Sequence, residues 1–307
     1  MQKYILARIG QGIFTLWALT VIVFLSVHLT GDPAIHLVPL EFATPEGLEI
    51  QRKKLGLDKP LIEQYGIFLK NVLQGDFGES ISDGRPARDI LASRLPATLQ
   101  LAAAGMGLAI LFGVPLGILS AVKRGSIFDQ FAKIFAVLGM AAPQFWVAII
   151  LILLFAAVWK VLPAFGRGGP ESFVLPAFVL AWSIMAGMMR LGRSSMLEIL
   201  DTEYIKFARV KGLKEQYVLW KHALRNSLIP LLTFSGISLA SLLNGAIVVE
   251  AVFAWPGIGR MLLDGVQQRN FPVVQAAVLA SGFFYVAISL VIDVLYAYID
   301  PRIRFNQ

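Results

Sequence analysis

Long apolar blocks separated by short polar segments dominate the pattern of this chain. A helix needs about 20 apolar residues to cross the hydrocarbon core of a membrane, and scanning finds such runs at six places. They lie near residues 9–29, 97–121, 131–158, 173–192, 228–249 and 273–298. The pattern therefore predicts an all-α polytopic membrane protein with six transmembrane helices.

Three of these runs contain residues that disturb a membrane helix. Pro143 lies inside the third run, where a proline removes a backbone hydrogen bond and predicts a kink. Arg190 and Arg193 make one end of the fourth run polar. Pro230 stands where the fifth run begins, which suits the first turn of a helix.

The segment between the first two runs is too long to be a simple connection. Part of it, near residues 60–73, has the pattern of a short surface helix. We therefore expect a small folded cap outside the membrane. The predicted organisation is an N-terminal helix with its extracytoplasmic cap over residues 1–96 and a membrane domain over residues 97–307.

Composition agrees with a membrane protein. The chain has 307 residues, of which 57% are hydrophobic and 15% are charged, and its mean hydropathy is +0.69. Its net charge of +7 fits the enrichment of Lys and Arg in cytoplasmic loops, so it does not indicate nucleic-acid binding. Because basic residues concentrate near both termini and in residues 190–225, both termini are predicted to be cytoplasmic.

The most polar segment between predicted spans, residues 193–227, contains a short amphipathic stretch. Tyr204, Phe207 and Ala208 are three and four residues apart, a spacing that predicts one apolar helical face. Gly212 then suits the left-handed turn that ends a helix. We expect a docking helix between two membrane spans, although a solvated basic connector has a similar composition.

Other chemistry is poorly supported by the sequence. The chain lacks a Gly-x-x-x-x-Gly-Lys-Ser/Thr phosphate loop and a Gly-x-Ser-x-Gly elbow, it contains no cysteine, and its three histidines are scattered. It is therefore predicted not to be an enzyme and to hold no metal. Asp293 in the last run is expected to pair with a basic group, and Glu250 is expected to reach water.

Candidate pathway residues are polar side chains within the apolar runs. Gln144 follows Pro143, and polar residues recur every three positions in the fifth run. These are Ser235, Ser238, Ser241 and Asn244. As a set facing one side they could line a pathway, whereas each alone is suited to bonding between helices.

Several blocks follow one another in a recognisable order, at residues 31–34, 55–58, 75–78, 94–99, 204–230, 250–260, 271–275 and 300–304. Together they resemble the permease subunits of bacterial type I ABC importers, in the branch that transports dipeptides and oligopeptides. The resemblance implies a location in the bacterial inner membrane. The wider permease pattern has Glu-Ala-Ala where this chain has Lys206, Phe207 and Ala208, a departure expected of the peptide branch.

The resemblance implies that this chain forms half of a translocation pathway and transmits motion from an ATPase. The expected partners are a second homologous permease, two ABC ATPase subunits or domains and an extracytoplasmic solute-binding protein. ATP and magnesium would be bound by the ATPase partners, with no cofactor in this chain. The segment 203–213 would be the coupling helix, and its candidate residues are Glu203, Tyr204, Phe207, Ala208, Lys211, Gly212 and Leu213.

Two kinds of alternative stay open. Related permeases carry nickel, glutathione or oligosaccharides, and the permease sequence does not select among these substrates. A secondary transporter driven by ions would be expected to contain more buried ionisable residues or an inverted repeat, and neither is seen.

Overall fold

The computed structural model describes residues 2–29, 49–50, 52–53 and 56–299, with the side chains of 2–4, 243–245 and 295–299 excepted. Two of the blocks that carried the resemblance, residues 31–34 and 300–304, lie outside the described residues, as does Leu55 of a third. The described part is helical, apart from one isolated antiparallel bridge between Glu79 and Pro86. The chain divides into two compact units. Unit 1 contains residues 1–99 and 255–307, and unit 2 contains residues 100–254. The predicted boundary at residue 96 stays a prediction.

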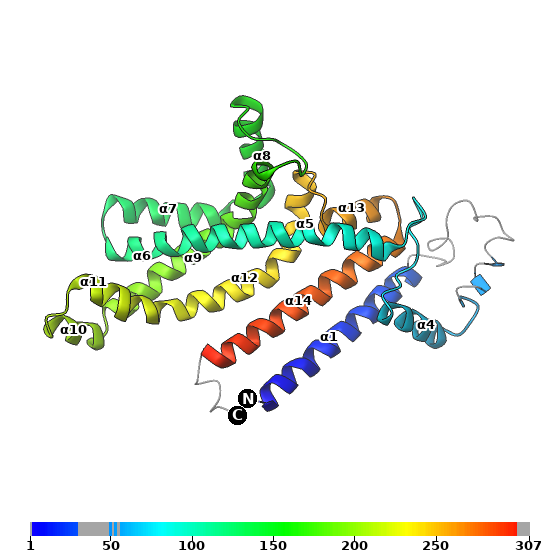
Figure 1. Ribbon diagram of the computed structural model, residues 1–307, viewed down its shortest axis with the longest axis horizontal. Helices are drawn as coiled ribbons and strands as arrows, with labels where there is room; N and C mark the ends of the chain where they lie inside the picture. Colours follow the sequence, from blue (N-terminus) through cyan, green and yellow to red (C-terminus); the bar gives the residue numbers. More distant parts are fainter. Residues whose placement is uncertain (1, 30–48, 51, 54–55, 300–307) are drawn as a thin grey trace. The chain divides into compact units, whose positions relative to one another are not determined.

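Unit 1 contains two long membrane-type helices that lie side by side, α1 (Gln2–Leu29) and α14 (Phe271–Ile299) (Figure 1). Glycines allow their close approach, because Gly12 faces Val286 and Gly282 faces Leu19. Near one end of the pair, Arg8 Nε lies 3.4 Å from Asp293 Oδ2. This ion pair confirms that Asp293 has a basic partner.

The predicted surface helix is α4 (Leu61–Leu73), which packs on α1. The Tyr65 hydroxyl lies 2.9 Å from Thr20 Oγ1. The His28 ring contacts Gln64 Oε1, also at 2.9 Å. These polar contacts connect the described part of the predicted cap to the first helix.

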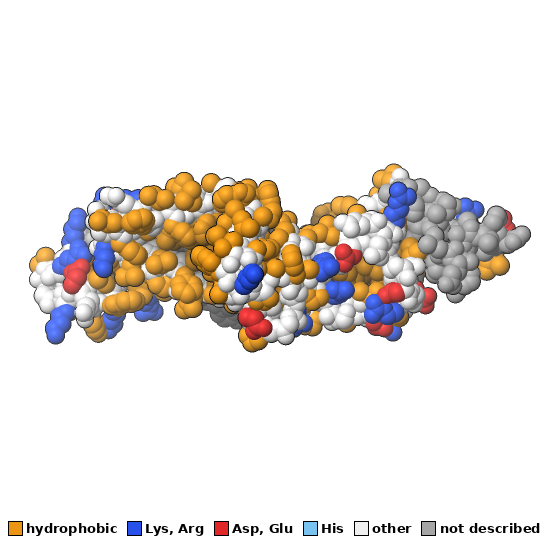
Figure 2. Space-filling model, turned by 90° about the horizontal axis from the view of Figure 1, so that it is seen from above, with side chains coloured by type: hydrophobic (Ala, Val, Ile, Leu, Met, Phe, Trp, Pro, Cys, Tyr) orange, Lys and Arg blue, Asp and Glu red, His pale blue; other side chains and the backbone are white. Residues whose placement is uncertain are grey.

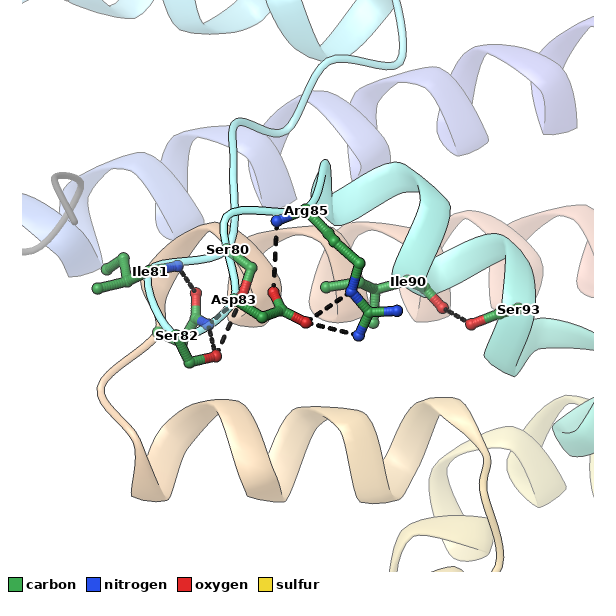
Figure 3. A network of polar contacts seen from close by, with 8 residues as sticks. Ser80, Ile81, Ser82, Asp83, Arg85, Ile90 and Ser93 are labelled. Carbon is green, nitrogen blue, oxygen red and sulfur yellow. Dashed lines mark hydrogen bonds and ion pairs between the residues drawn. The ribbon is translucent and has the colours of Figure 1, made fainter.

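The polar loop before α5 (Ala87–Leu108) is hydrogen-bonded to the turn between α13 (Ile258–Gln267) and α14. The Asn270 amide donates to Ser80 Oγ at 2.8 Å and accepts from the Ile81 backbone N–H at 3.2 Å. Asp83 and Arg85 point toward one another in the same loop (Figure 3). Hydrogen bonds from Ser80 and Arg85 hold the pKa of Asp83 below its ordinary value.

The start of α13 is fixed against α5 by buried contacts within unit 1. The Trp255 indole N–H donates to the Ala97 carbonyl at 3.0 Å, and the Ile258 backbone N–H donates to Thr98 Oγ1 at 2.8 Å. Trp255 is completely buried. An indole that is buried in this way needs a partner for its N–H, and the carbonyl supplies one.

Unit 2 is built around α9 (Val174–Leu200), which packs against most other helices of the unit. The unit also contains the end of α5 and several further elements (Figure 1). They are η2 (Ala109–Gly113), α6 (Val114–Val122), α7 (Ile127–Ala141), α8 (Gln144–Leu151), η3 (Ile152–Val158), η4 (Pro170–Phe173), α10 (Glu203–Val210), α11 (Glu215–Tyr217), η5 (Val218–Ala223) and α12 (Leu224–Val252).

The six predicted spans correspond to four unbroken helices and two bent pairs among the described residues. The unbroken ones are Ile5–Leu29, Ala87–Val122, Pro170–Leu200 and Phe271–Val294, and the bent pairs are Ile127–Ala141 with Gln144–Val158 and Glu215–Leu242 with Ala246–Val252. If each bent pair is one span, the total is six. The fourth helix continues to Leu200, beyond the predicted end at residue 192.

The structure changes direction at Pro143 more sharply than the predicted kink within one helix. The chain bends by 109° between Ile127–Ala141 and Gln144–Val158. Ala142 has the extended backbone that the residue before a proline prefers, and α8 starts immediately after Pro143. Pro143 therefore separates two helices. Pro230 also differs from expectation, because it lies inside α12 and not in a first turn.

Candidate functional site

The candidate site is the loop between α9 and α12, where the structure forms the predicted helix as α10. Thr202 precedes it with extended backbone, and Glu203 places a carboxylate in its first turn, where negative charge is favourable. Gly212 has φ +76°, which confirms the left-handed turn expected after the helix. The polar loop is thus a defined short helix with a fixed end.

One side of α10 is buried in unit 2. Ile205 and Ala208 pack with Met196 of α9 and with residues of α6 and η5. Those other residues are Ile118, Ala121, Val218 and Ala223. This cluster attaches α10 to the ends of two long helices.

The composition of the exposed face therefore differs from the prediction. Tyr204 and Phe207 are 52% and 61% exposed, as expected for a docking face, but Ala208 points into the cluster. Val210, which the sequence analysis did not select, is 83% exposed. We call Tyr204, Phe207, Val210 and Lys211 the exposed face of α10.

The electrostatics of the loop hold its shape. Arg209 donates to both carboxylate oxygens of Glu215, at 2.7 and 3.1 Å, and this pairing raises the pKa of Arg209 above its ordinary value. The Lys211 ammonium lies 4.8 Å from the centre of the Phe207 ring. The Tyr204 hydroxyl contacts the His222 ring. Basic side chains gather around α10 and α11, at the left of Figure 2.

The remaining coupling candidates lie at the edges of this helix. Glu203 pairs with Lys206 at 2.8 Å on the surface, and Leu213 is exposed in the turn that follows Gly212. Their role, like that of the whole set, stays a prediction. The signal that could have identified Ile205 is its spacing of three residues from Ala208, which places both on one side of a helix.

The pathway candidates do not share one environment. Gln144 begins α8 and donates to Ser183 of α9 at 3.5 Å. Ser238 is buried, whereas Ser241 is exposed and bonds back to the Ile237 carbonyl.

Ser235 makes the same kind of bond to its own helix, donating to the Leu231 carbonyl at 2.7 Å. The side chain of Asn244 lies outside the described residues. The three serines thus differ in exposure, and a pathway role for each residue stays a prediction.

The expectation that Glu250 reaches water was wrong. Its side chain is completely buried in α12, one turn before Phe253, which is itself buried. The helix continues for two residues beyond Glu250, to Val252. Hydropathy alone placed Glu250 at the end of a span and could not show this burial.

Comparisons with known proteins agree with the fold. Residues 113–305 match the family described as binding-protein-dependent transport system inner membrane component, and residues 1–102 match its N-terminal companion family. The glutathione transport system permease protein GsiC of Escherichia coli K12 is 41% identical over 307 residues, which is 100% of both chains. GsiC of Shigella flexneri serotype 5b has the same identity and coverage.

A solved structure supports the architecture. An inward-facing structure of the MetNI methionine ABC transporter matches with a TM-score of 0.55 and 19% identity, covering 68% of this chain and 94% of that chain. At this identity the likeness concerns the fold alone. The chain belongs to the family of binding-protein-dependent transport system inner membrane components, and it has the fold of a type I ABC importer permease.

Proposed function

We propose that this chain is the permease subunit of an ATP-driven importer for small peptides, and that glutathione is the first substrate to test. The observation that supports this substrate class is the 41% identity to GsiC along the entire chain. Glutathione is itself a tripeptide, so it falls within the class suggested by the dipeptide and oligopeptide branch. Nickel and oligosaccharides stay the alternative substrates.

In this proposal the chain pairs with a second permease and receives a solute-binding protein on its outer loops. Two partner ATPase subunits bind ATP and magnesium on the cytoplasmic side, where both termini of this chain also lie. ATP favours the closed ATPase dimer, and the resulting movement shifts the permease between inward-open and outward-open states. This chain contributes binding, shape and movement, and its partners carry out the hydrolysis.

The exposed face of α10 is the proposed contact with an ATPase subunit. Tyr204, Phe207 and Val210 present apolar surface that would fill a groove, and Lys211 adds a positive charge beside it. The opposite side of the helix is already buried against unit 2. A helix that is packed on one side and exposed on the other is suited to transmit movement of the ATPase subunit to the membrane helices.

The test replaces Phe207 by Asp, because a charge in an apolar groove is costly to bury. Detergent-solubilised F207D is expected to lose most of the copurifying ATPase subunits and, in vesicles, at least about 90% of ATP-dependent glutathione uptake, since an interface anchor commonly contributes 2 kcal/mol or more. Leu73→Asp is the matched control, because it adds a charge at another exposed apolar position, on α4. It is expected to retain the ATPase subunits.

Substrate identity is tested in the same vesicles. Uptake of labelled glutathione, of a labelled dipeptide and of nickel is compared at equal concentration with the loaded binding protein outside. Uptake of nickel alone would contradict the peptide class. Normal recovery of ATPase subunits by F207D would contradict the contact through α10, whatever the substrate.

A further inference from the structure

A buried carboxylate outside the exposed face of α10 has no role in the function proposed so far. Asp129, in the first turn of α7, is completely buried. Arg193 of α9 donates to it from Nε at 2.7 Å and from Nη2 at 3.1 Å. The desolvation of two buried charges offsets much of the attraction between them. Stabilisation of the fold alone is therefore a weak explanation for this buried ion pair.

Further donors from two more elements complete the site. The Ser120 hydroxyl of α6 donates to Asp129 Oδ1 at 2.6 Å, and the Gly125 backbone N–H donates to Oδ2 at 3.0 Å. Lys133, one turn later on α7, lies 3.0 Å from the same carboxylate but is half exposed. One carboxylate thus connects α6, α7 and α9, and every group around it is a donor.

The same three helices are packed too closely to slide past one another freely. A Cβ atom at Gly117 of α6 would lie 2.5 Å from the Met189 carbonyl oxygen of α9. A Cβ at Gly139 of α7 would lie 2.5 Å from the Ala186 Cβ of α9. Glycines at such contacts let helix backbones approach closely in membranes. The carboxylate therefore lies in a region of close packing.

This region also holds α10. Ile118 and Ala121, on either side of Ser120 in α6, pack against the buried side of α10. Met196, three residues after Arg193 in α9, belongs to the same cluster. The buried side of α10 thus rests on two helices that the carboxylate connects.

We propose that Asp129, Arg193 and Ser120 form a positioning clamp that makes α6, α7 and α9 move with α10 as one body. A displacement of α10 by the ATPase subunit then moves all three membrane helices together, because they do not shift relative to one another. This inference rests on the proposed coupling through α10. Because all neighbours of the carboxylate are donors, the site requires an anion, and an asparagine would place an N–H₂ group among them.

The first experiment measures substrate molecules imported per ATP hydrolysed, in vesicles that contain the complete importer and the loaded binding protein. Asp129→Asn and Arg193→Lys are expected to lower this ratio about tenfold, since a charge-assisted hydrogen bond contributes on the order of 1.5–3 kcal/mol. The ATPase subunits should stay bound, because the exposed face of α10 is untouched. Lys133→Gln is the matched control on the same carboxylate and should keep the wild-type ratio.

The second experiment measures rigidity directly. The chain contains no cysteine, so Arg124→Cys and Gln216→Cys place two spin labels at exposed positions near α7 and in α11. Double electron–electron resonance should give a narrow distance distribution that is the same with and without ATP. The distribution should broaden when Asp129→Asn is added.

Three results would overturn the clamp. One is a wild-type distance that changes with nucleotide, and another is an Asp129→Asn distribution as narrow as the wild type. The third is a wild-type number of substrate molecules imported per ATP hydrolysed in Arg193→Lys. This variant keeps both charges, so it provides the test if Asp129→Asn does not assemble. Failure of the proposed contact through α10 would instead appear as normal recovery of the ATPase subunits by F207D, so the two proposals fail separately.

Discussion

At the scale of single residues, Gly212 is required for its backbone conformation and not for close packing. Its φ is +76°, and no atom lies within 4 Å of a Cβ placed on it. A side chain there would meet open space, so any effect of substitution must come from the backbone. Left-handed backbone costs an L residue roughly 1–2 kcal/mol, and more for a β-branched one.

Gly212→Val is therefore expected to loosen the end of α10 and to lower ATP-dependent uptake about tenfold, the equivalent of 1.4 kcal/mol within that range. Uptake in vesicles, normalised to the amount of assembled complex, measures the effect. Gly212→Asn is the control, because asparagine tolerates this conformation better than other residues. Equal uptake by both variants and the wild type would show that the turn does not matter for coupling.

Features of α10 that depend on local spacing could be predicted from the sequence, whereas those that depend on distant residues could not. The left-handed turn at Gly212 and the position of α10 were predicted, because both depend on local spacing. The inward position of Ala208 was missed, since it depends on Met196 and Val218, which are distant in sequence or in another element. The clamp was missed for the same reason, because 64 residues separate Asp129 from Arg193.

At the scale of elements, Pro143 and Pro230 of unit 2 occupy different backbone environments. Pro143 precedes α8 with φ −63°, a value that its ring prefers. Pro230 lies inside α12, where its ring removes one helical hydrogen bond. The sequence predicted a kink at Pro143 and a first-turn proline at Pro230, but it could not show that the first separates two helices and the second lies inside one, because that depends on which backbone each neighbour adopts.

Substitution of each proline by alanine should therefore change stability in opposite directions. Pro143→Ala is expected to lower the unfolding free energy by about 0.4–1 kcal/mol, because the unfolded chain gains freedom. Pro230→Ala is expected to raise it by about 0.5–1.5 kcal/mol through the recovered hydrogen bond. Thermal midpoints in one detergent compare the two variants. Shifts of the same sign would contradict this assignment of the two sites.

At the scale of the whole molecule, the proposed function requires a defined orientation across the membrane. Lys and Arg residues are concentrated in the segment that contains α10, and eight of them occur in residues 190–225. Such enrichment is typical of cytoplasmic loops. The helix α4 belongs to the long segment after the first predicted span, so it should lie on the opposite side.

Single cysteines test this orientation, since the chain has none of its own. Leu73→Cys in α4 is expected to react with a membrane-impermeant maleimide in intact spheroplasts, because its side chain is 80% exposed. Lys214→Cys, exposed after α10, should react only after permeabilisation. The reverse pattern would place α10 outside the cell, where no ATPase can reach it, and would therefore contradict the proposed coupling together with the orientation.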